Sequence, residues 1–174
     1  MSETKQSQMS WSQSWWDKIV SWTDSTWGGD LDTMRSTTGY VVMLAGAAIS
    51  WNSRLQPTVA LSSTEAEYMA CTSVLQDVMH HRMLHEECGF KISEPTLVME
   101  DNQGCIHMAK AQGNHKRVKH LDLKTHFIRQ AVDAGTVTLK YVPTNDQLAD
   151  ALTKALPRQR FELLRNKMMN IGSS

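Results

Sequence analysis

The sequence predicts an α/β fold with a mixed five-stranded sheet, and three observations lead to that prediction. The first third of the chain contains three strand-like segments separated by turn residues. A long segment with apolar residues at helical spacing follows them. Two further strand-like segments each come after a helical segment, and a strand that follows a helical crossover pairs in parallel with its neighbour. We therefore expect three antiparallel strands and then parallel strands, flanked by helices.

The size and composition of the chain indicate a single domain. Its 174 residues are enough for one hydrophobic core and too few for two. With 41% hydrophobic residues and no apolar run near the ~18 residues that a membrane helix needs, no membrane association is expected. The three cysteines form no paired pattern and the N-terminus has no signal-peptide pattern. An intracellular location, in the cytoplasm or nucleus, is therefore expected.

Three parts are expected along the chain. Residues 1–17 are mostly polar and are predicted to form a disordered or loosely packed lead, residues 18–156 the α/β domain, and residues 157–174 a basic helix and tail. The net charge is zero, but residues 1–109 contain 6 Lys and Arg against 13 Asp and Glu, and residues 110–174 contain 12 against 5. The resulting charges of −7 and +7 suggest an acidic site beside a basic surface, but the charges alone favour the simpler interpretation, ordinary solvated faces of both signs.

Turn residues delimit the expected strands. Asp24 falls near the end of the first strand, before Gly28 and Gly29, and Asp101 is the last residue of the fourth strand, which Pro95 introduces. The segments predicted as strands are 19–24, 39–48, 48–53, 96–101 and 136–142.

Capping residues and helix breakers delimit the expected helices. The first begins after Ser62, a good N-cap residue, and ends before Gly89. Its apolar stripe comprises Tyr68, Cys71, Leu75 and Val78, widened by Met79 and Met83. Residues 144–147 have the spacing of a capping box, which predicts a helix that contains Asp150. The other predicted helices are 103–111, 121–134 and a last one after Pro157.

Two acidic residues in the first turns of the long helix point in different directions. Glu65 lies three residues after Ser62, the spacing of a capping box. Glu67 is aligned with Cys71 at the edge of the apolar stripe, where an ionised carboxylate is costly without a compensating partner. Glu67 is therefore a candidate metal ligand. On this segment alone, a capping role for Glu67 with Thr64 as the N-cap is equally compatible.

Four carboxylates are expected to converge on one site: Asp24, Glu67, Asp101 and Asp150. The ends of neighbouring strands in an open sheet form the crevice where ligands bind, and the helix that contains Asp150 is expected to pack nearby. No Lys or Arg is expected among these acids. Their mutual repulsion then implies hard divalent cations held by oxygen ligands.

Five segments of the chain carry a recognisable pattern. They are 35–41 (RSTTGYV), 60–70 (ALSSTEAEYMA), 100–104 (EDNQG), 119–129 (KHLDLKTHFIR) and 141–157 (YVPTNDQLADALTKALP). Together they resemble the ribonuclease H domain of the polyprotein of Ty1/copia-type LTR retrotransposons. The resemblance extends over about residues 18 to 168 in unbroken order.

The resemblance implies a ribonuclease H-like fold and endonucleolytic hydrolysis of the RNA strand of RNA–DNA hybrids with two Mg²⁺ ions, for which Mn²⁺ can substitute. It implies that Asp24 bridges both ions, that Glu67 and Asp101 hold the ion at the leaving oxygen, and that Asp150 holds the ion that carries the attacking water. Two such ions would neutralise charge on the entering and leaving oxygens of a phosphodiester. A polymerase domain normally precedes this domain in the polyprotein, and the domain itself is expected to be a monomer.

Nucleic-acid contacts are predicted at two places. One set is expected to approach the minor groove, where 2′-hydroxyl groups distinguish RNA from DNA, although turn formation explains its glycines equally well. It comprises Gly28, Gly29, Asn102 and Gln103. The second set is basic and is expected to contact phosphates without reading sequence. It comprises Lys116, Arg117 and Lys119.

The chain departs from the family pattern in its first motif and in its length. Residues 24–27 read Asp-Ser-Thr-Trp, where Asp-Ala-Asp-Trp is usual, so the second acid is lost. No polymerase domain precedes the first strand, and the chain is therefore expected to be a polyprotein fragment, a degenerate copy or a captured host gene. The leading hypothesis is an active Mg²⁺-dependent ribonuclease H. The alternative is a catalytically degenerate, retroelement-derived nucleic-acid-binding module.

Overall fold

A computed structural model describes residues 18–110 and 119–172, and in it five strands form one sheet in the order β3-β2-β1-β4-β5. The strands are β1 (Ile19–Thr26), β2 (Thr37–Leu44), β3 (Ala47–Leu55), β4 (Thr96–Glu100) and β5 (Val137–Tyr141). β2 is antiparallel to β1 and β3, whereas β4 is parallel to β1 and β5. The predicted mixed sheet is therefore confirmed. The predicted lead at residues 1–17 lies outside the described residues.

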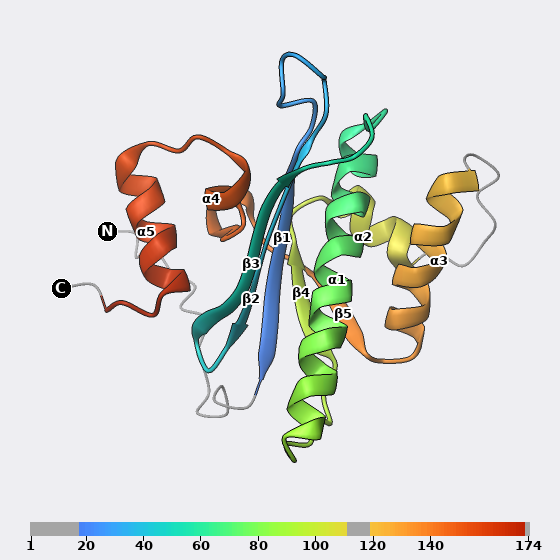
Figure 1. Cartoon of the computed structure of the whole chain (residues 1–174), viewed down its shortest axis with the longest axis vertical. Coiled ribbons are helices and arrows are strands. Elements are labelled where there is room, and N and C mark those ends of the chain that lie inside the picture. The colour runs from blue at the N-terminus through green and yellow to red at the C-terminus, as the bar shows by residue number, and fades with distance from the viewer. Residues whose placement is uncertain (1–17, 111–118, 173–174) are drawn as a thin grey trace, which may run out of the picture.

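Helices cover both faces of this sheet. They are α1 (Ser63–Glu87), α2 (Gln103–Lys110), α3 (Lys119–Asp133), α4 (Asp150–Thr153) and α5 (Arg158–Met168). α1, α2 and α3 lie on one face and α4 and α5 on the other (Figure 1). None of the helices in the described ranges is long and apolar enough to cross a membrane.

Each face of the sheet has its own hydrophobic core because neighbouring residues of a strand point to opposite faces. Val42 of β2 belongs to the core under α1, whereas its neighbour Val41 belongs to the core under α4 and α5. Leu164 of α5 is completely buried in that second core. α5 is therefore anchored to the sheet by burial of apolar surface.

The start of α1 settles which acid caps the helix. The Ser62 hydroxyl accepts a hydrogen bond from the Glu65 backbone N–H at 3.1 Å, and Glu65 Oε2 accepts one from the Leu61 N–H at 2.8 Å. Glu65 is therefore the capping residue, as predicted, and Glu67 is left for another role. Met83, expected on the core side, is 53% exposed because the last turns of α1 run past the sheet (Figure 1).

The predicted helix from Thr144 through Asp150 is wrong. Residues Thr144–Asp146 form a single 3₁₀ turn without a side-chain cap, and the four-residue helix α4 begins at Asp150. The Thr144 hydroxyl instead donates to Asp101 Oδ2 at 2.8 Å. A contact across 43 residues has replaced the local capping interaction that the sequence suggested.

α4 packs closely on β2 at Gly39, which lies opposite Asp24 in the β1–β2 ladder. A Cβ atom at Gly39 would lie 2.5 Å from Thr153 Cγ2 and 3.2 Å from the Ala149 carbonyl oxygen. We expect Gly39→Ala to force α4 away from the sheet and to lower the free energy of unfolding by about 1–3 kcal/mol.

Urea unfolding of the Gly39→Ala variant measures this effect. Gly172→Ala is the matched control, because a Cβ there meets no atom within 4 Å. Equal stability of the two variants would mean that α4 can move without cost.

Candidate active site

Three carboxylates converge at one end of the sheet. Asp24 in β1, Glu67 in α1 and Asp101 directly after β4 each offer an oxygen, and these oxygens all lie within 4.8 Å of one another. Strand pairing explains part of this: Trp22 is opposite Met99 in the parallel ladder, and Asp24 and Asp101 each lie two residues further along. We call Asp24, Glu67 and Asp101 the acid trio.

The acid trio lies in an environment that disfavours negative charge. Asp24 is 1% exposed and Glu67 is 6% exposed. Burial raises the pKa of Asp24 to about 6, even though the Thr153 hydroxyl and the Lys154 ammonium oppose the shift. Burial, reinforced by the charges of Asp24 and Asp101, raises the pKa of Glu67 to about 9. Carboxyl groups whose pKa is raised in this way are stabilised most by a partner that favours their ionised form.

The chemistry of the donor atoms fits a hard divalent cation. All the ligand atoms in the acid trio are carboxylate oxygens, the type that Mg²⁺ and Mn²⁺ prefer. Glu67 Oε2 is buried and has no hydrogen-bond partner among the described residues. A buried acceptor without a partner is costly, and a cation bound there would remove that cost.

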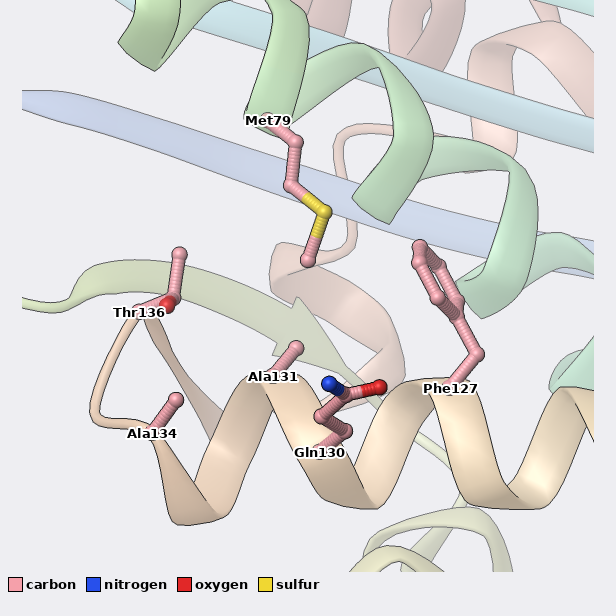
Figure 2. Close-up of a pocket in the computed structure, with 6 residues that line it drawn as sticks. All are labelled: Met79, Phe127, Gln130, Ala131, Ala134 and Thr136. Carbon is pink, nitrogen blue, oxygen red and sulfur yellow. The ribbon is translucent and has the colours of Figure 1, made fainter.

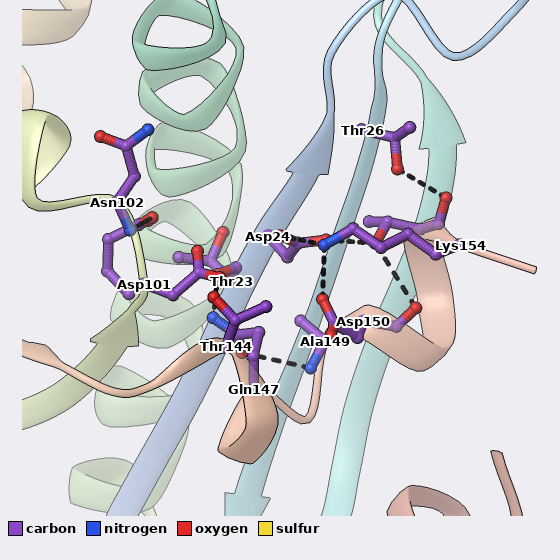
Figure 3. Close-up of polar contacts among 12 residues, drawn as sticks. Thr23, Asp24, Thr26, Asp101, Asn102, Thr144, Gln147, Ala149, Asp150 and Lys154 are labelled. Carbon is purple, nitrogen blue, oxygen red and sulfur yellow. Dashed lines mark hydrogen bonds and ion pairs between the residues drawn. The ribbon is translucent and has the colours of Figure 1, made fainter. Parts of the chain in front are cut away.

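Asp150 lies beside the acid trio but is paired with cations from the protein itself. Lys154 Nζ lies 2.6 Å from Asp150 Oδ1 and 3.3 Å from Asp24 Oδ1 (Figure 3). Arg160 Nη2 lies 3.9 Å from Asp150 Oδ2. The expectation that no Lys or Arg stands among the four acids is therefore wrong. Burial lowers the pKa of Lys154 and the contacts with Asp150 and Asp24 raise it, with a net upward shift.

Threonine hydroxyl groups fix two of the carboxylates. Thr153 in α4 donates to Asp24 Oδ2, and Thr144 donates to Asp101 Oδ2. Arg160 in turn donates to the Thr144 carbonyl oxygen at 3.2 Å. These contacts connect α4 and α5 to the acids, and sequence reasoning missed them because the partners lie 43 and 129 residues apart.

Glu100 is a further acid that sequence reasoning missed. It is the last residue of β4 and is completely buried. Its Oε1 accepts the Asn102 N–H at 3.0 Å, whereas Oε2 has no partner among the described residues. Burial and the nearby Glu67 raise the pKa of Glu100 well above its usual range. The signal was present, because a glutamate directly after the apolar run Leu97-Val98-Met99 is unusual.

Two of the four residues predicted to approach the minor groove have structural roles as well. Gly28 has φ +59°, in the left-handed region, and its N–H donates to the Ser36 hydroxyl at 3.2 Å. Asn102 Oδ1 accepts the Cys105 N–H at 3.0 Å and so caps α2. Gly29 and Gln103 are exposed. Turn and cap formation therefore accounts for two of the four residues without any ligand.

The predicted basic set is described only in part. Lys119 is the first residue of α3. Lys116 and Arg117 lie outside the described residues. Their contact with phosphates stays a prediction from the sequence.

A separate hollow lies between α1 and α3, with a volume of about 240 Å³ (Figure 2). It is lined by Met79, Phe127, Gln130, Ala131, Ala134 and Thr136. Met79 is twelve residues after Glu67 in α1, about 18 Å along the helix axis. The hollow has no ionisable group in its lining and is separate from the acid trio.

Sequence comparison relates the chain to retrotransposon polyproteins. It is 40% identical over 145 residues to the retrovirus-related Pol polyprotein from transposon TNT 1-94 of Nicotiana tabacum, a match that covers 83% of this chain and 11% of the relative. It is 38% identical over 150 residues to the corresponding polyprotein from transposon RE2 of Arabidopsis thaliana, covering 86% of this chain and 10% of the relative. The homologues are Pol polyproteins of Ty1/copia-type retrotransposons, and their matches cover most of this chain. We call the chain the Pol segment for this similarity; it spans about a tenth of the length of the curated relatives that it matches. No protein-family model matches it.

Structural comparison shows that the Pol segment has the ribonuclease H fold. It matches LC11-RNase H1, isolated from compost, with a TM-score of 0.59 and 17% identity over 79% of this chain and 93% of that chain. It matches a foamy viral protease-reverse transcriptase in complex with an RNA/DNA hybrid with a TM-score of 0.54 and 15% identity over 88% of this chain and 22% of that chain. The family and the fold expected from the five sequence segments are both confirmed.

Proposed function

We propose that the Pol segment cleaves the RNA strand of RNA–DNA hybrids endonucleolytically, with divalent cations held by the acid trio and Asp150. The observation that carries this proposal is the convergence of the acid trio within 4.8 Å at the end of a ribonuclease H sheet. Similarity to the retrotransposon Pol polyproteins supports it. Two structural neighbours, LC11-RNase H1 and the foamy viral enzyme, were solved in complex with RNA/DNA hybrid, which supports the same substrate class here.

In this proposal Asp24, Glu67 and Asp101 would hold one cation, and Asp24 and Asp150 would hold a second. Bound divalent cations such as Mg²⁺ would supply an activated water and neutralise charge on a phosphodiester. The contribution of the protein itself is to hold the carboxylates in position. Asp24 lies on the central strand β1, and the Thr153 hydroxyl holds one of its oxygens. A carboxylate fixed in this way needs little reorganisation during reaction, which favours catalysis.

Substrate contacts are proposed on either side of the acid trio. Gln103 and Gly29 are exposed near Asp101 and the end of β1, where a minor groove would pass over the carboxylates. The basic set of Lys116, Arg117 and Lys119 would contact phosphates, which gives affinity without sequence preference. Because the matched part is only about a tenth of the length of the Pol relatives, we propose that a polymerase portion of the polyprotein adds further binding surface.

Incubation of the purified chain with an end-labelled hybrid and Mg²⁺ tests the proposal. We expect internal cuts in the RNA strand, no cuts in the DNA strand, and no product in excess chelator. A DNA duplex of the same sequence is the control substrate. Retention of the hybrid in a gel shift without cleavage would contradict the proposal and favour a nucleic-acid-binding module.

A further inference from the structure

Lys154 lies where a cation shared by Asp24 and Asp150 would lie. Its ammonium is 2.6 Å from Asp150 Oδ1 and 3.3 Å from Asp24 Oδ1, and Figure 3 shows it between the two side chains. Asp150 is 4% exposed and Asp24 is 1% exposed, so both carboxylates need a positive partner. The Lys154 side chain is itself 35% exposed and reaches the pair from the solvent side.

The backbone that carries Lys154 is held firmly in place. The Thr26 hydroxyl donates to the Thr153 carbonyl oxygen at 2.7 Å, and the Ser53 hydroxyl donates to the Leu152 carbonyl oxygen at 2.6 Å. The Lys154 N–H donates to the Asp150 carbonyl oxygen at 3.0 Å. The mobile part of Lys154 is therefore its side chain, which is long, flexible and partly exposed to solvent.

We propose that the Lys154 ammonium is a built-in counter-cation, and that a divalent cation reaches the position between Asp24 and Asp150 only by displacing it. Two cations a few ångströms apart repel strongly, so the ammonium and a metal ion cannot share this position. The inference rests on the proposed function only in that it assumes cation binding by these acids.

Two members of the acid trio, Glu67 and Asp101, have no Lys or Arg nitrogen within ion-pair distance in the part of the chain that the structure describes. Asp24 is the one member that Lys154 contacts, at 3.3 Å, whereas the shorter contact of Lys154, 2.6 Å, is with Asp150. A first cation held mainly by Glu67 and Asp101 therefore binds without expelling a side chain, whereas a second, between Asp24 and Asp150, must displace Lys154. The two ions are expected to bind in a fixed order and with unequal affinity.

Calorimetric titration of the metal-free protein with Mn²⁺ tests this inference. We expect the parent to bind one ion more tightly than a second. Lys154→Met should tighten the second ion about tenfold, the scale of one charge-assisted contact expressed as affinity. Lys154→Arg, which keeps the charge, should resemble the parent. Lys140→Met is the matched control, because Lys140 is exposed on β5 and its loss changes the net charge equally.

Melting in chelator and in Mn²⁺ gives a second readout. Lys154→Met should melt below the parent in chelator, because Asp24 and Asp150 lose their partner, and should gain more from Mn²⁺. If Lys154→Met does not fold, the same Mn²⁺ titration is made with Lys154→Gln, which can still donate hydrogen bonds to both carboxylates. Second-ion affinities that are equal in the Lys154 and Lys140 variants would overturn the inference.

The ion-binding test gives its result whether or not the protein cleaves hybrids. Tighter second-ion binding in a protein that leaves hybrids intact would support the counter-cation and refute the proposed function. Cleavage by the parent together with unchanged ion binding in the Lys154 variants would support the proposed function and refute the counter-cation.

Discussion

The Glu67→Gln variant is expected to lose hybrid cleavage by at least about 100-fold, the upper end of what losing even an outer-shell partner of a metal ligand costs. Glutamine keeps the size of the side chain and removes the negative charge. Glu67 is 6% exposed and one of its carboxylate oxygens has no partner among the described residues, so packing does not explain its position, whereas the proposed cation would. Initial rates on a labelled hybrid in saturating Mg²⁺ measure the loss.

Glu65→Gln is the control, two residues away in the same helix turn. Glu65 Oε2 accepts the Leu61 N–H, and a glutamine carbonyl oxygen can accept the same bond. We expect near-parent cleavage and a stability change below about 1 kcal/mol. Equal loss of activity in the two variants would mean that the cleavage site does not depend on the face of α1 that carries Glu67.

Much of the fold was predictable because its local signals agree. Gly89 and Ser62 delimit α1 in the sequence and in the structure, and the strand segments differ from the observed strands by only a few residues. The region from Thr144 to Asp150 was not predictable. Its capping pattern is locally sound, but the Thr144 hydroxyl contacts Asp101 instead, and that choice depends on a parallel strand 43 residues earlier.

The candidate site shows the same division between local and distant information. The acid trio follows from strand ends and helix periodicity, which are local. The Lys154 contact with Asp150 is a local i,i+4 pair, but its contact with Asp24 requires α4 to pack on β2 at Gly39. Charge counting over whole halves of the chain could not reveal one lysine inside an acidic cluster.

The metal-free protein is expected to lose stability as the pH rises from about 4.5 to 9. The pKa of Glu67 is near 4.5 in an unfolded chain and about 9 in the folded protein, and that of Asp24 rises from 3.8 to about 6. Between these values the folded protein holds protons that the unfolded chain has released. Stability from these groups is therefore complete below the unfolded pKa values and is lost as the pH rises through the folded ones. Each group contributes a slope of up to about 1.4 kcal/mol per pH unit.

Urea unfolding in chelator at several pH values between 6 and 8.5 checks this slope, with Glu67→Gln as the informative variant. Because glutamine does not titrate, we expect the Glu67→Gln variant to be more stable than the parent above pH 7 and to show a flatter dependence on pH. Glu65→Gln should keep the parent slope.

Mg²⁺ should reverse the loss of stability with rising pH in the parent. Metal ligands must be deprotonated, so the stabilisation that Mg²⁺ gives to the parent grows with pH. We expect Mg²⁺ to stabilise Glu67→Gln less, because this variant lacks one of the ligands. The same substitution would then stabilise the metal-free fold and remove activity, as expected where function rather than packing placed a charge. Parallel pH profiles for the parent and Glu67→Gln would show that Glu67 is not forced to hold a proton in the metal-free fold.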